Sequence, residues 1–288
     1  MNIPENMINR GRRSDIPTWP DGKRIAVLIA FDIDADTMWY THADHFNGSI
    51  SDLSRGAYGP KQGVPRILDM LDRQKIKATF FVPGVVAEMY PDIVREVALR
   101  GHEIGYHGYL HEESTKTTYE EENATMLKAE KIILDLTGQR LRGHRGPGGV
   151  FHDYSLRLFV EHGYIHSSNF RDADGPFIHR ENGKRVPVVE LPKDSVFDDT
   201  AYDFYTETPP ERYELKSPRE MYEIWKDEFD ALSSEGRMMN FVLHPQFFGR
   251  AGRVRMLSDL IDYMRENGAW FATNAECAEY VLKQNGML

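Results

Sequence analysis

Apolar runs alternate with segments of helical periodicity along most of this chain. Near-continuous apolar runs predict strands at residues 24–33, 78–82, 103–106, 141–144, 164–168, 186–191, 240–243 and 270–273. Apolar positions at helical spacing predict helices at residues 64–71, 93–99, 119–136, 154–162, 218–234, 254–267 and 275–283. Strands with so few polar positions are typical of a parallel sheet covered on both faces. The alternation therefore predicts an α/β fold built from repeated βα units.

The number of predicted strands bears on the architecture. Seven or eight parallel strands in one run favour a closed or nearly closed barrel with helices outside it. A doubly wound open sheet is the alternative. The chain has 288 residues, which is enough for one large α/β domain and short for two. We therefore expect an N-terminal extension over residues 1–22 and a single barrel domain over residues 23–288.

Two polar segments, residues 39–63 and 194–216, interrupt this alternation, and we predict long connections there. Connections of this length inside a compact domain are usually functional or take part in oligomers. Both segments also contain aromatic residues that a monomer would leave exposed. We therefore expect a homo-oligomer in which these segments help to enclose each site.

Composition and charge narrow the classes of partner. Apolar residues make up 41% and charged residues 28%, and the formal net charge of −10 gives no reason to bind nucleic acid or an anionic membrane. Residues 1–20 contain no apolar run long enough for a signal peptide or a membrane span. The single Cys277 excludes an intrachain disulfide and fits a reducing compartment. We expect a cytoplasmic protein without nucleic-acid or membrane partners.

Carboxylates follow the first predicted strand, which ends in Asp32-Ile33-Asp34. In a parallel barrel the active site forms at the carboxyl ends of the strands. Residues two apart in an extended segment point to the same side, so Asp32 and Asp34 are both expected at the mouth of the barrel. Two adjacent carboxylates repel each other unless a cation lies between them. The pair indicates a metal site, although a lone Asp after a strand more often has a capping or turn role.

Two histidines four residues apart, His107 and His111, follow the third predicted strand. At this spacing they would lie on one face of a helical turn, at about the separation that one ion requires. Taken alone, the pair is equally consistent with surface or core histidines. Together with Asp34, the imidazoles form a three-ligand set with open positions for water, which is the arrangement of catalytic metal sites.

Two further strand ends carry candidate groups. The fourth strand leads into residues 145–149, where Arg145 could hold a neighbouring carboxylate ionised and a free amide could donate to an oxyanion. By itself this segment predicts only a turn. His244 follows the penultimate strand, and a side chain with a pKa near neutrality suits a general acid there. By itself it is more often a structural histidine.

These four signals occur in one order on successive strand ends. Together they resemble the motifs of the polysaccharide deacetylase superfamily, the NodB-like proteins of carbohydrate esterase family 4. Its two-Asp motif is similar to Asp32 and Asp34, and its HxxxH motif to His107 and His111. Its Arg-x-Pro-x-Gly motif is similar to residues 145–149, and its Leu-x-x-His motif is similar to residues 241–244 through Leu243 and His244. The resemblance spans roughly residues 22–282 and implies a deformed (β/α) barrel. Residues 54–56, 80–84 and 101–105 resemble a branch of cytoplasmic allantoinase-like, cyclic-imide-hydrolysing and peptidoglycan-deacetylase-like proteins.

The resemblance also implies roles for individual residues. Asp34, His107 and His111 would hold one divalent metal ion per chain, with Zn²⁺ expected and Co²⁺, Mn²⁺ or Ni²⁺ as alternatives. Asp32 would take the proton of the attacking water, and Arg145 would keep this carboxylate ionised. His244 would protonate the leaving nitrogen. These roles describe a metal-dependent hydrolase of carbon–nitrogen bonds other than peptide bonds.

The sequence departs from the glycan-hydrolysing members at two points. Gly148 stands where they usually have Tyr, and their aromatic-rich groove motif has no clear match; the nearest counterpart is 190–192 followed by Asp198-Asp199. We therefore predict a small cyclic imide or ureide as the substrate, with Pro147, Gly148 and Asp199 as substrate or oxyanion contacts. The alternative within this chemistry is N-deacetylation of a sugar or peptidoglycan fragment. A non-haem iron enzyme and an inactive binding module are the alternatives from other classes.

Overall fold

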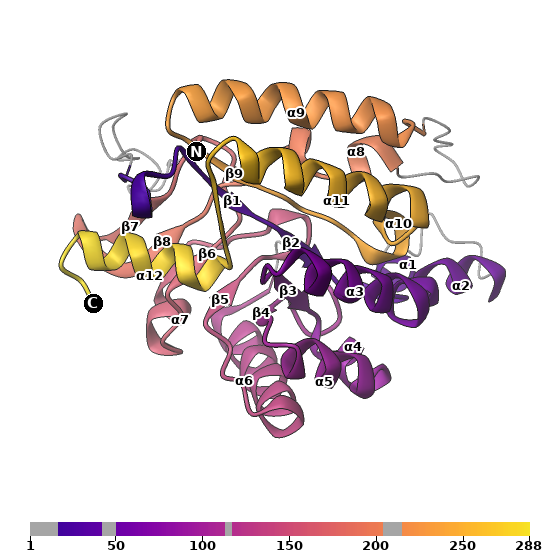
Figure 1. Cartoon of the computed structure of the whole chain (residues 1–288). Coiled ribbons are helices and arrows are strands. Elements are labelled where there is room, and N and C mark those ends of the chain that lie inside the picture. The colour runs from indigo at the N-terminus through magenta and orange to yellow at the C-terminus, as the bar shows by residue number, and fades with distance from the viewer. Residues whose placement is uncertain (1–16, 42–49, 113–116, 204–214) are drawn as a thin grey trace.

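The computed structural model describes residues 17–41, 50–112, 117–203 and 215–288. Within these ranges, parallel strands form a central barrel and helices cover its outside, as Figure 1 shows. The first predicted strand is divided at Ile29 into β1 (Ile25–Leu28) and β2 (Ala30–Asp32). Every residue from Ile25 to Ile33 is buried, which accounts for the near absence of polar positions before Asp32.

The barrel closes through contacts between distant parts of the chain. Around it, β2 is followed by β3 (Thr79–Val82), β4 (Glu103–Tyr106), β5 (Gly143–His144), β6 (His166–Ser167) and β8 (Lys184–Glu190), and β9 (Met238–Asn240) pairs with β1. Parallel bridges from Asp198 to Val242 and from Phe31 to Leu243 complete the ring. An eighth parallel strand, β10 (Ala269–Ala272), pairs with β1. The barrel prediction is confirmed, and the open-sheet alternative is wrong because these bridges join both edges.

One strand of the barrel wall was not predicted. Strand β7 (Phe177–Glu181) runs antiparallel to β8 and extends the sheet beyond it. Asn182 and Gly183 connect the two strands, and both have positive φ, 49° and 75°, as a two-residue hairpin turn requires. Strand β7 begins with two apolar residues and continues with three polar ones, so it lacks the continuous apolar run of the barrel strands; it lies at the edge of the sheet.

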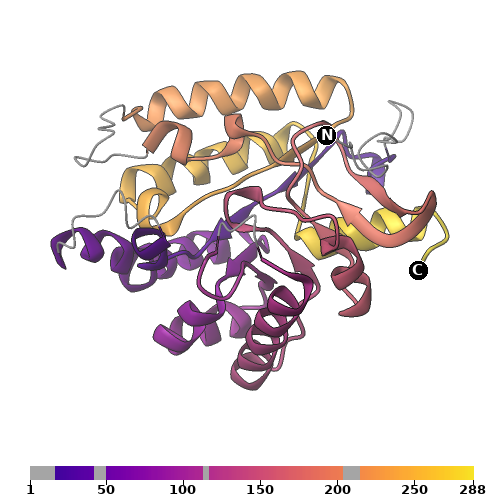
Figure 2. The same cartoon turned by 180° about the vertical axis from the view of Figure 1, so that it is seen from behind.

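The helices cover the barrel in separate groups, which Figures 1 and 2 show from opposite sides. They are α3 (Val64–Gln74), α4 (Gly84–Met89), α5 (Pro91–Leu99), α6 (Tyr119–Thr137), α7 (Ser155–Glu161), α9 (Pro218–Ser234), α11 (Ala251–Glu266) and α12 (Asn274–Gln284). All but α4 were predicted. The ends of α6 follow from its sequence: Thr118 and Glu121 form a capping box, and Gly138 ends the helix with φ of 74°.

The segment 39–63, predicted as a loop, is largely helical. It contains the end of α1 (Thr37–Thr41), all of α2 (Ile50–Tyr58) and a π-helical turn over Gly59–Gly63, while residues 42–49 lie outside the described part. The glycines misled the prediction, since they allow close packing here and do not mark a turn. A side chain on Gly59 would press on Gln246, and one on Gly63 would collide with the backbone of Pro245.

The segment 194–216 is also more regular than predicted. Ser195–Phe197 form a 3₁₀ turn and α8 spans Thr200–Asp203, while residues 204–214 lie outside the described part. Asp194 caps the 3₁₀ turn by accepting from the Val196 amide at 2.9 Å. The short α10 (Pro245–Phe248) follows the end of β9 and packs on the turn at Gly59–Gly63. Both segments therefore contribute helical structure around the mouth of the barrel.

The described start of the chain lies along α12. Tyr280 donates to the carbonyl oxygen of Thr18 at 2.6 Å, and Trp19 packs against Trp270 with ring centroids 5.9 Å apart. Residues 1–16 lie outside the described part, so the boundary of the N-terminal extension stays a prediction. Among the described helices, none is long and apolar enough to cross a bilayer.

Candidate metal centre

Three predicted ligands meet at the mouth of the barrel. Asp34 lies just beyond β2, and His107 follows the last residue of β4. The Asp34 Oδ1 atom lies 3.3 Å from Nε2 of His107 and 3.5 Å from Nε2 of His111. One ligand atom from each residue lies within 4.8 Å of the others. The three side chains predicted as one site therefore converge on a common point.

The conformation between the histidines differs from the prediction. Residues 107–112 form a bend and no helix, so the two imidazoles do not share a helical face. Gly108 and His111 have positive φ, 75° and 61°, and this backbone turns both rings toward Asp34. A non-glycine residue with positive φ is uncommon outside strained functional segments. The HxxxH spacing predicted the contact, but it did so through the wrong local structure.

The atoms at this point fit a divalent cation. Nδ1 of His107 lies 2.5 Å from the carbonyl oxygen of Arg145 and donates to it, so the lone pair of Nε2 faces Asp34. Oδ1 of Asp34 is fully buried and has no hydrogen-bond partner among the described residues. A buried carboxylate oxygen that faces imidazole lone pairs is costly unless a cation joins them. Burial would raise the pKa of Asp34, but its interactions with His111, His107 and His244 outweigh burial and hold that pKa well below its ordinary value.

The second carboxylate is held by a buried arginine. Nη1 of Arg145 donates to Oδ1 of Asp32 at 2.9 Å, and both side chains are at most 2% exposed. Ser168 and Asn240 accept hydrogen bonds from the same guanidinium, and the Phe81 ring lies 4.4 Å from its central carbon. Burial alone would raise the pKa of Asp32, but Arg145 together with His107 and His244 outweighs burial and lowers that pKa. Asp32 is therefore an ionised carboxylate beside the three ligands.

His244 lies on the other side of Asp34, with Nε2 at 3.6 Å from Oδ2 of that carboxylate. Asp199, predicted as a substrate contact, instead accepts from both Nδ1 and the backbone amide of His244, at 2.5 Å and 2.8 Å. Burial opposes a charged imidazole, but Asp199 outweighs it and raises the pKa of His244 to about 10. The pairing with Asp199 therefore favours the protonated imidazole, whose Nε2 faces the site. Asp198, Asp199 and His244 form a second group of possible metal ligands. In that group, however, Asp199 and His244 are already hydrogen-bonded to each other.

Comparison with known proteins identifies the group to which this site belongs. The Polysaccharide deacetylase family matches residues 57–166. A crystal structure of a protein from Mycobacterium smegmatis, described as a candidate polysaccharide deacetylase, is 31% identical, covers 93% of this chain and 94% of its own, and superposes with a TM-score of 0.88. The chain belongs to the polysaccharide deacetylase family. Members of this family are hydrolases of carbon–nitrogen bonds.

Two further relatives cover nearly the whole polysaccharide deacetylase fold of this chain. The crystal structure of PuuE allantoinase has a TM-score of 0.84 at 25% identity and covers 98% of both chains. Peptidoglycan deacetylase of Helicobacter pylori is 27% identical over 91% of this chain and 98% of its own length. The family resemblance read from the motifs is therefore confirmed, and the relatives include proteins named for different substrates.

The remaining predicted contacts lie on the turn after Arg145. Pro147 is buried against the bend that follows His107, whereas Gly148 is exposed and has φ of 60°. The carbonyl oxygen of Gly148 accepts from Arg171 at 3.4 Å. A left-handed residue suits glycine, which explains why Tyr does not occupy position 148 in this backbone. Whether a backbone amide of this turn contacts an oxyanion stays a prediction.

Three supporting residues were missed by the sequence reasoning. Ser168 and Asn240 hold Arg145 in place. Gln246 donates to Oδ2 of Asp34 at 3.3 Å and is 1% exposed. A metal-binding carboxylate commonly has such an outer partner for its second oxygen. The one available signal was that Gln246 lies just past a predicted strand, where site residues of a barrel are found.

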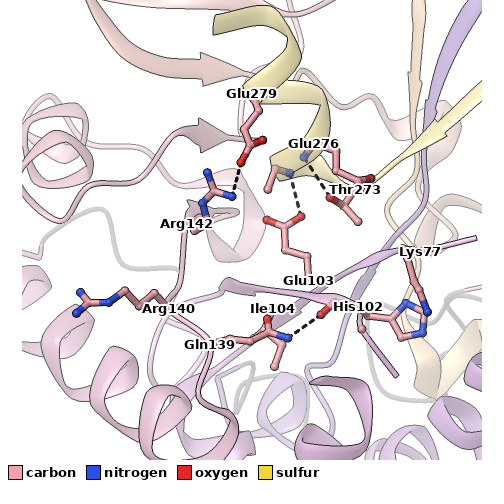
Figure 3. Close-up of a pocket in the computed structure, with 12 residues that line it drawn as sticks. Lys77, His102, Glu103, Ile104, Gln139, Arg140, Arg142, Thr273, Glu276 and Glu279 are labelled. Atoms are coloured by element: carbon pink, nitrogen blue, oxygen red, sulfur yellow. Dashed lines mark hydrogen bonds and ion pairs between the residues drawn. The ribbon is translucent and has the colours of Figure 1, made fainter. Parts of the chain in front are cut away.

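A hollow of about 230 Å³ lies away from this centre, where β3, β4 and β5 begin (Figure 3). Its described lining includes Lys77, His102, Glu103, Arg140, Arg142 and Glu279. Arg142 pairs with Glu279 at 2.5 Å, and Glu103 accepts from the Ala275 amide of α12 at 2.9 Å. None of the predicted site residues is in the described lining, so this hollow is separate from the metal centre.

Proposed function

We propose that this chain is a metal-dependent hydrolase of carbon–nitrogen bonds other than peptide bonds, and that its substrate is a small cyclic imide or ureide. The observation that carries this proposal is the burial of the reactive groups. Asp34 is 1% exposed, His107 2%, His111 5% and His244 9%. A glycan strand needs an open groove along which several sugars can lie, whereas a small ring can be enclosed almost completely.

The residues of the centre have distinct tasks in this proposal. Asp34, His107 and His111 hold the ion, and we propose Zn²⁺. Co²⁺, Mn²⁺ and Ni²⁺ are alternatives, because imidazole and carboxylate ligands suit all four ions. Such an ion, when bound, polarises a carbonyl and makes water more acidic. The contacts that Asp34 makes through its second oxygen, with Gln246, fix the direction of the carboxylate.

Proton transfer falls to two other groups. Asp32 takes a proton from the attacking water, and Arg145 keeps this carboxylate ionised between turnovers. His244 gives its Nε2 proton to the departing nitrogen, because expulsion of an amine as an anion is unfavourable. Asp199 stabilises the imidazolium that this step requires. Together the two groups take a proton on one side of the scissile bond and supply one on the other.

The relatives support two candidate substrate classes. Allantoin, for which the similar allantoinase is named, is a cyclic ureide, and that similarity covers 98% of this chain. The similarity to the Helicobacter pylori peptidoglycan deacetylase supports the second candidate, N-deacetylation of a sugar or peptidoglycan fragment. A non-haem iron enzyme could use the same three ligands, but it would leave the Asp32–Arg145 pair without a task.

A hydrolysis screen of the metal-loaded protein tests the proposal. Cyclic imides, ureides and N-acetylated sugars are incubated with the wild type and with Asp34→Asn, which removes a proposed ligand. Ring opening by the wild type alone would support the imide or ureide assignment. Release of acetate alone would favour the second candidate. Equal reaction by both proteins would contradict the metal-dependent mechanism.

We also propose a homo-oligomer in which the segments near the mouth meet a second copy. Two large apolar side chains within segment 39–63 are exposed, Ile50 by 84% and Tyr40 by 56%. Such side chains commonly contact a partner when they are grouped. Light scattering at micromolar concentration measures the mass, and a monomeric mass would contradict this proposal.

A further inference from the structure

Lys193 is a charged residue of the barrel mouth for which the mechanism has no task. It follows the carboxyl end of β8, and its backbone amide donates to the carbonyl oxygen of Phe170 at 3.0 Å. The carbonyl oxygens of the two residues before it accept from Nδ2 of Asn240, the residue that also holds Arg145. Lys193 therefore lies beside the Asp32–Arg145 pair, and only 7% of it is exposed.

The ammonium group of Lys193 lacks the partners that its neighbour has. Arg145 is 0% exposed, and its guanidinium is hydrogen-bonded to Asp32, Ser168 and Asn240. For Nζ of Lys193, the described part of the chain provides no hydrogen bond and no carboxylate within 4.0 Å. Most of the Lys193 side chain is buried, but Nζ itself is not fully enclosed, so a group that enters from solvent can reach it.

The charges around Lys193 agree with this picture. Burial is the main reason that its pKa is lowered, and the nearby guanidinium of Arg145 lowers it further. The carboxylates of Asp32 and Asp198 oppose this effect but do not reverse it.

The formal charges of the centre point the same way. Three carboxylates of the centre are buried, Asp32, Asp34 and Asp199, and none of them lies within 4.0 Å of Nζ of Lys193. Asp32 is paired with Arg145, and Asp199 is paired with His244. A divalent ion on Asp34 would leave the centre with excess positive charge, and Lys193 would still have no counterion. A negatively charged group on a ligand would provide one.

We propose that Lys193 binds a carboxylate on the substrate, so that the enzyme prefers cyclic imides or ureides that carry an acidic group. This inference rests on the proposed function, because it names the substrate class of the same site. The ammonium fixes the orientation of the ring at a point away from the scissile bond. Lys193 is thus a specificity-determining residue, and the metal, Asp32 and His244 act on any ring that enters.

A matched pair of substrates tests the proposal. Succinimide carries no charge, and its carboxymethyl derivative on a ring carbon carries one carboxylate. For metal-loaded wild type we expect the charged imide to have the higher kcat/KM. In Lys193→Met, kcat/KM for the charged imide should fall roughly 10- to 100-fold, mainly through KM, since a charge-assisted hydrogen bond is lost. For succinimide the change in kcat/KM should stay below about threefold, because this neutral imide has no carboxylate for Lys193 to bind.

A binding measurement keeps this inference distinct from the proposed function. Succinate is titrated calorimetrically into the metal-loaded wild type, Lys193→Met and Lys193→Gln, with Lys131→Met as the control. Lys131 lies on α6, pairs with Asp135 and is far more exposed, so this control removes the same charge outside the centre. We expect at least about tenfold weaker binding for both Lys193 variants and unchanged binding for the control.

Three outcomes would overturn the inference. Equal losses on both imides would show that Lys193 supports the catalytic groups, and no loss on either would show that it does not meet the substrate. Succinate binding that is unchanged in both Lys193 variants would contradict carboxylate recognition directly. If the wild type opens no imide or ureide, the proposed function fails, while the calorimetric comparison still decides whether Lys193 binds a carboxylate. Thermal unfolding of each variant, at or above the wild-type temperature, verifies that the fold is intact.

Discussion

The two ends of β4 both bring a carboxylate to a histidine, yet they differ in what those groups leave unsatisfied. At its start, Glu103 contacts Nε2 of His166 at 2.7 Å and accepts from Thr79 and from the Ala275 amide at 2.7 Å and 2.9 Å. Beyond its end, Asp34 Oδ1 faces two imidazoles at 3.3 Å and 3.5 Å without a hydrogen bond. Both oxygens of the Glu103 carboxylate are hydrogen-bonded, one of them to α12, whereas Oδ1 of Asp34 has no hydrogen bond from the described residues.

This difference separates a structural pair from a candidate ligand set. The Glu103 side chain is 10% exposed and that of Asp34 2%, and both lie next to histidine, so residue type and proximity do not distinguish them. What distinguishes them is whether the acceptor lone pairs are satisfied within the chain. Several groups that line the hollow near Glu103 (Figure 3) bond to each other, such as Arg142 with Glu279, although Nε2 of His102 has no partner in the described part of the chain. At the mouth, three ligand atoms converge on one point without bonding. A ligand is expected where the polar atoms are unsatisfied.

The largest expected effect is on bound metal. Asp34→Asn should lower the content from about one divalent ion per chain to below roughly one tenth, with loss of hydrolysis, because a neutral amide is a poor ligand. Glu103→Gln, the matched change at the other end of β4, should retain the ion. Elemental analysis of the purified proteins measures both. Retention of the ion by Asp34→Asn, or its loss from Glu103→Gln, would reverse the assignment of the two ends.

Asp32→Asn should come next, since it removes the proposed base but no ligand. We expect a normal metal content and a decrease in kcat of roughly 10²–10⁴-fold, the usual contribution of a positioned base. Steady-state kinetics with metal-loaded protein provide the measurement. Near-normal turnover would assign proton abstraction to another group.

His244→Ala should have an effect that depends on the substrate. With a basic leaving nitrogen we expect kcat to fall roughly 10²–10⁴-fold, and with an acidic leaving nitrogen we expect a smaller loss, because less protonation is needed there. The metal content should not change. A series of substrates with graded leaving groups is compared between wild type and variant. A uniform loss across the series would instead favour a role in binding or in metal support.

Glu103→Gln should have the smallest effect on activity and a measurable effect on stability. We expect less than about a threefold change in kcat and a loss of about 1–3 kcal/mol in the free energy of unfolding, the cost of weakening a buried hydrogen-bonded group. Denaturant unfolding at neutral pH measures the second quantity. Unchanged stability would contradict the structural role of this carboxylate.

The pH dependence of that stability has a defined sign. Burial would raise the pKa of Glu103, but His166 and the hydrogen bonds to Thr79 and Ala275 outweigh it and lower that pKa. A carboxyl whose pKa is lower in the folded state stabilises the fold above its unfolded value, about 4.3, and loses this contribution as the pH falls. The difference in stability between wild type and Glu103→Gln should therefore shrink below about pH 4.

Sequence patterns predicted the parts of the molecule that depend on local order. The barrel strands and most helices follow from apolar periodicity, and Asp34, His107 and His111 follow from motifs at strand ends. Asn240 and Ser168 could not be predicted, because their role depends on Arg145, which lies far from Asn240 in sequence. The prediction of a loop over segment 39–63 was wrong, because its glycines allow close packing against other parts of the chain and do not mark turns. The function of Asp199 was likewise visible only once His244 lay against it.

The position of β1 has a consequence for how the chain folds. Its register joins Ala26 to Met238 on one side and to Trp270 on the other, so the first strand made is paired with the last two. Such long-range pairing requires large loops to close, and it slows folding. During synthesis, both edges of β1 stay unpaired until nearly the whole chain has been made. An apolar strand with open edges is prone to aggregation, so chaperone demand on the nascent chain should exceed that of an α/β protein in which sequential strands pair.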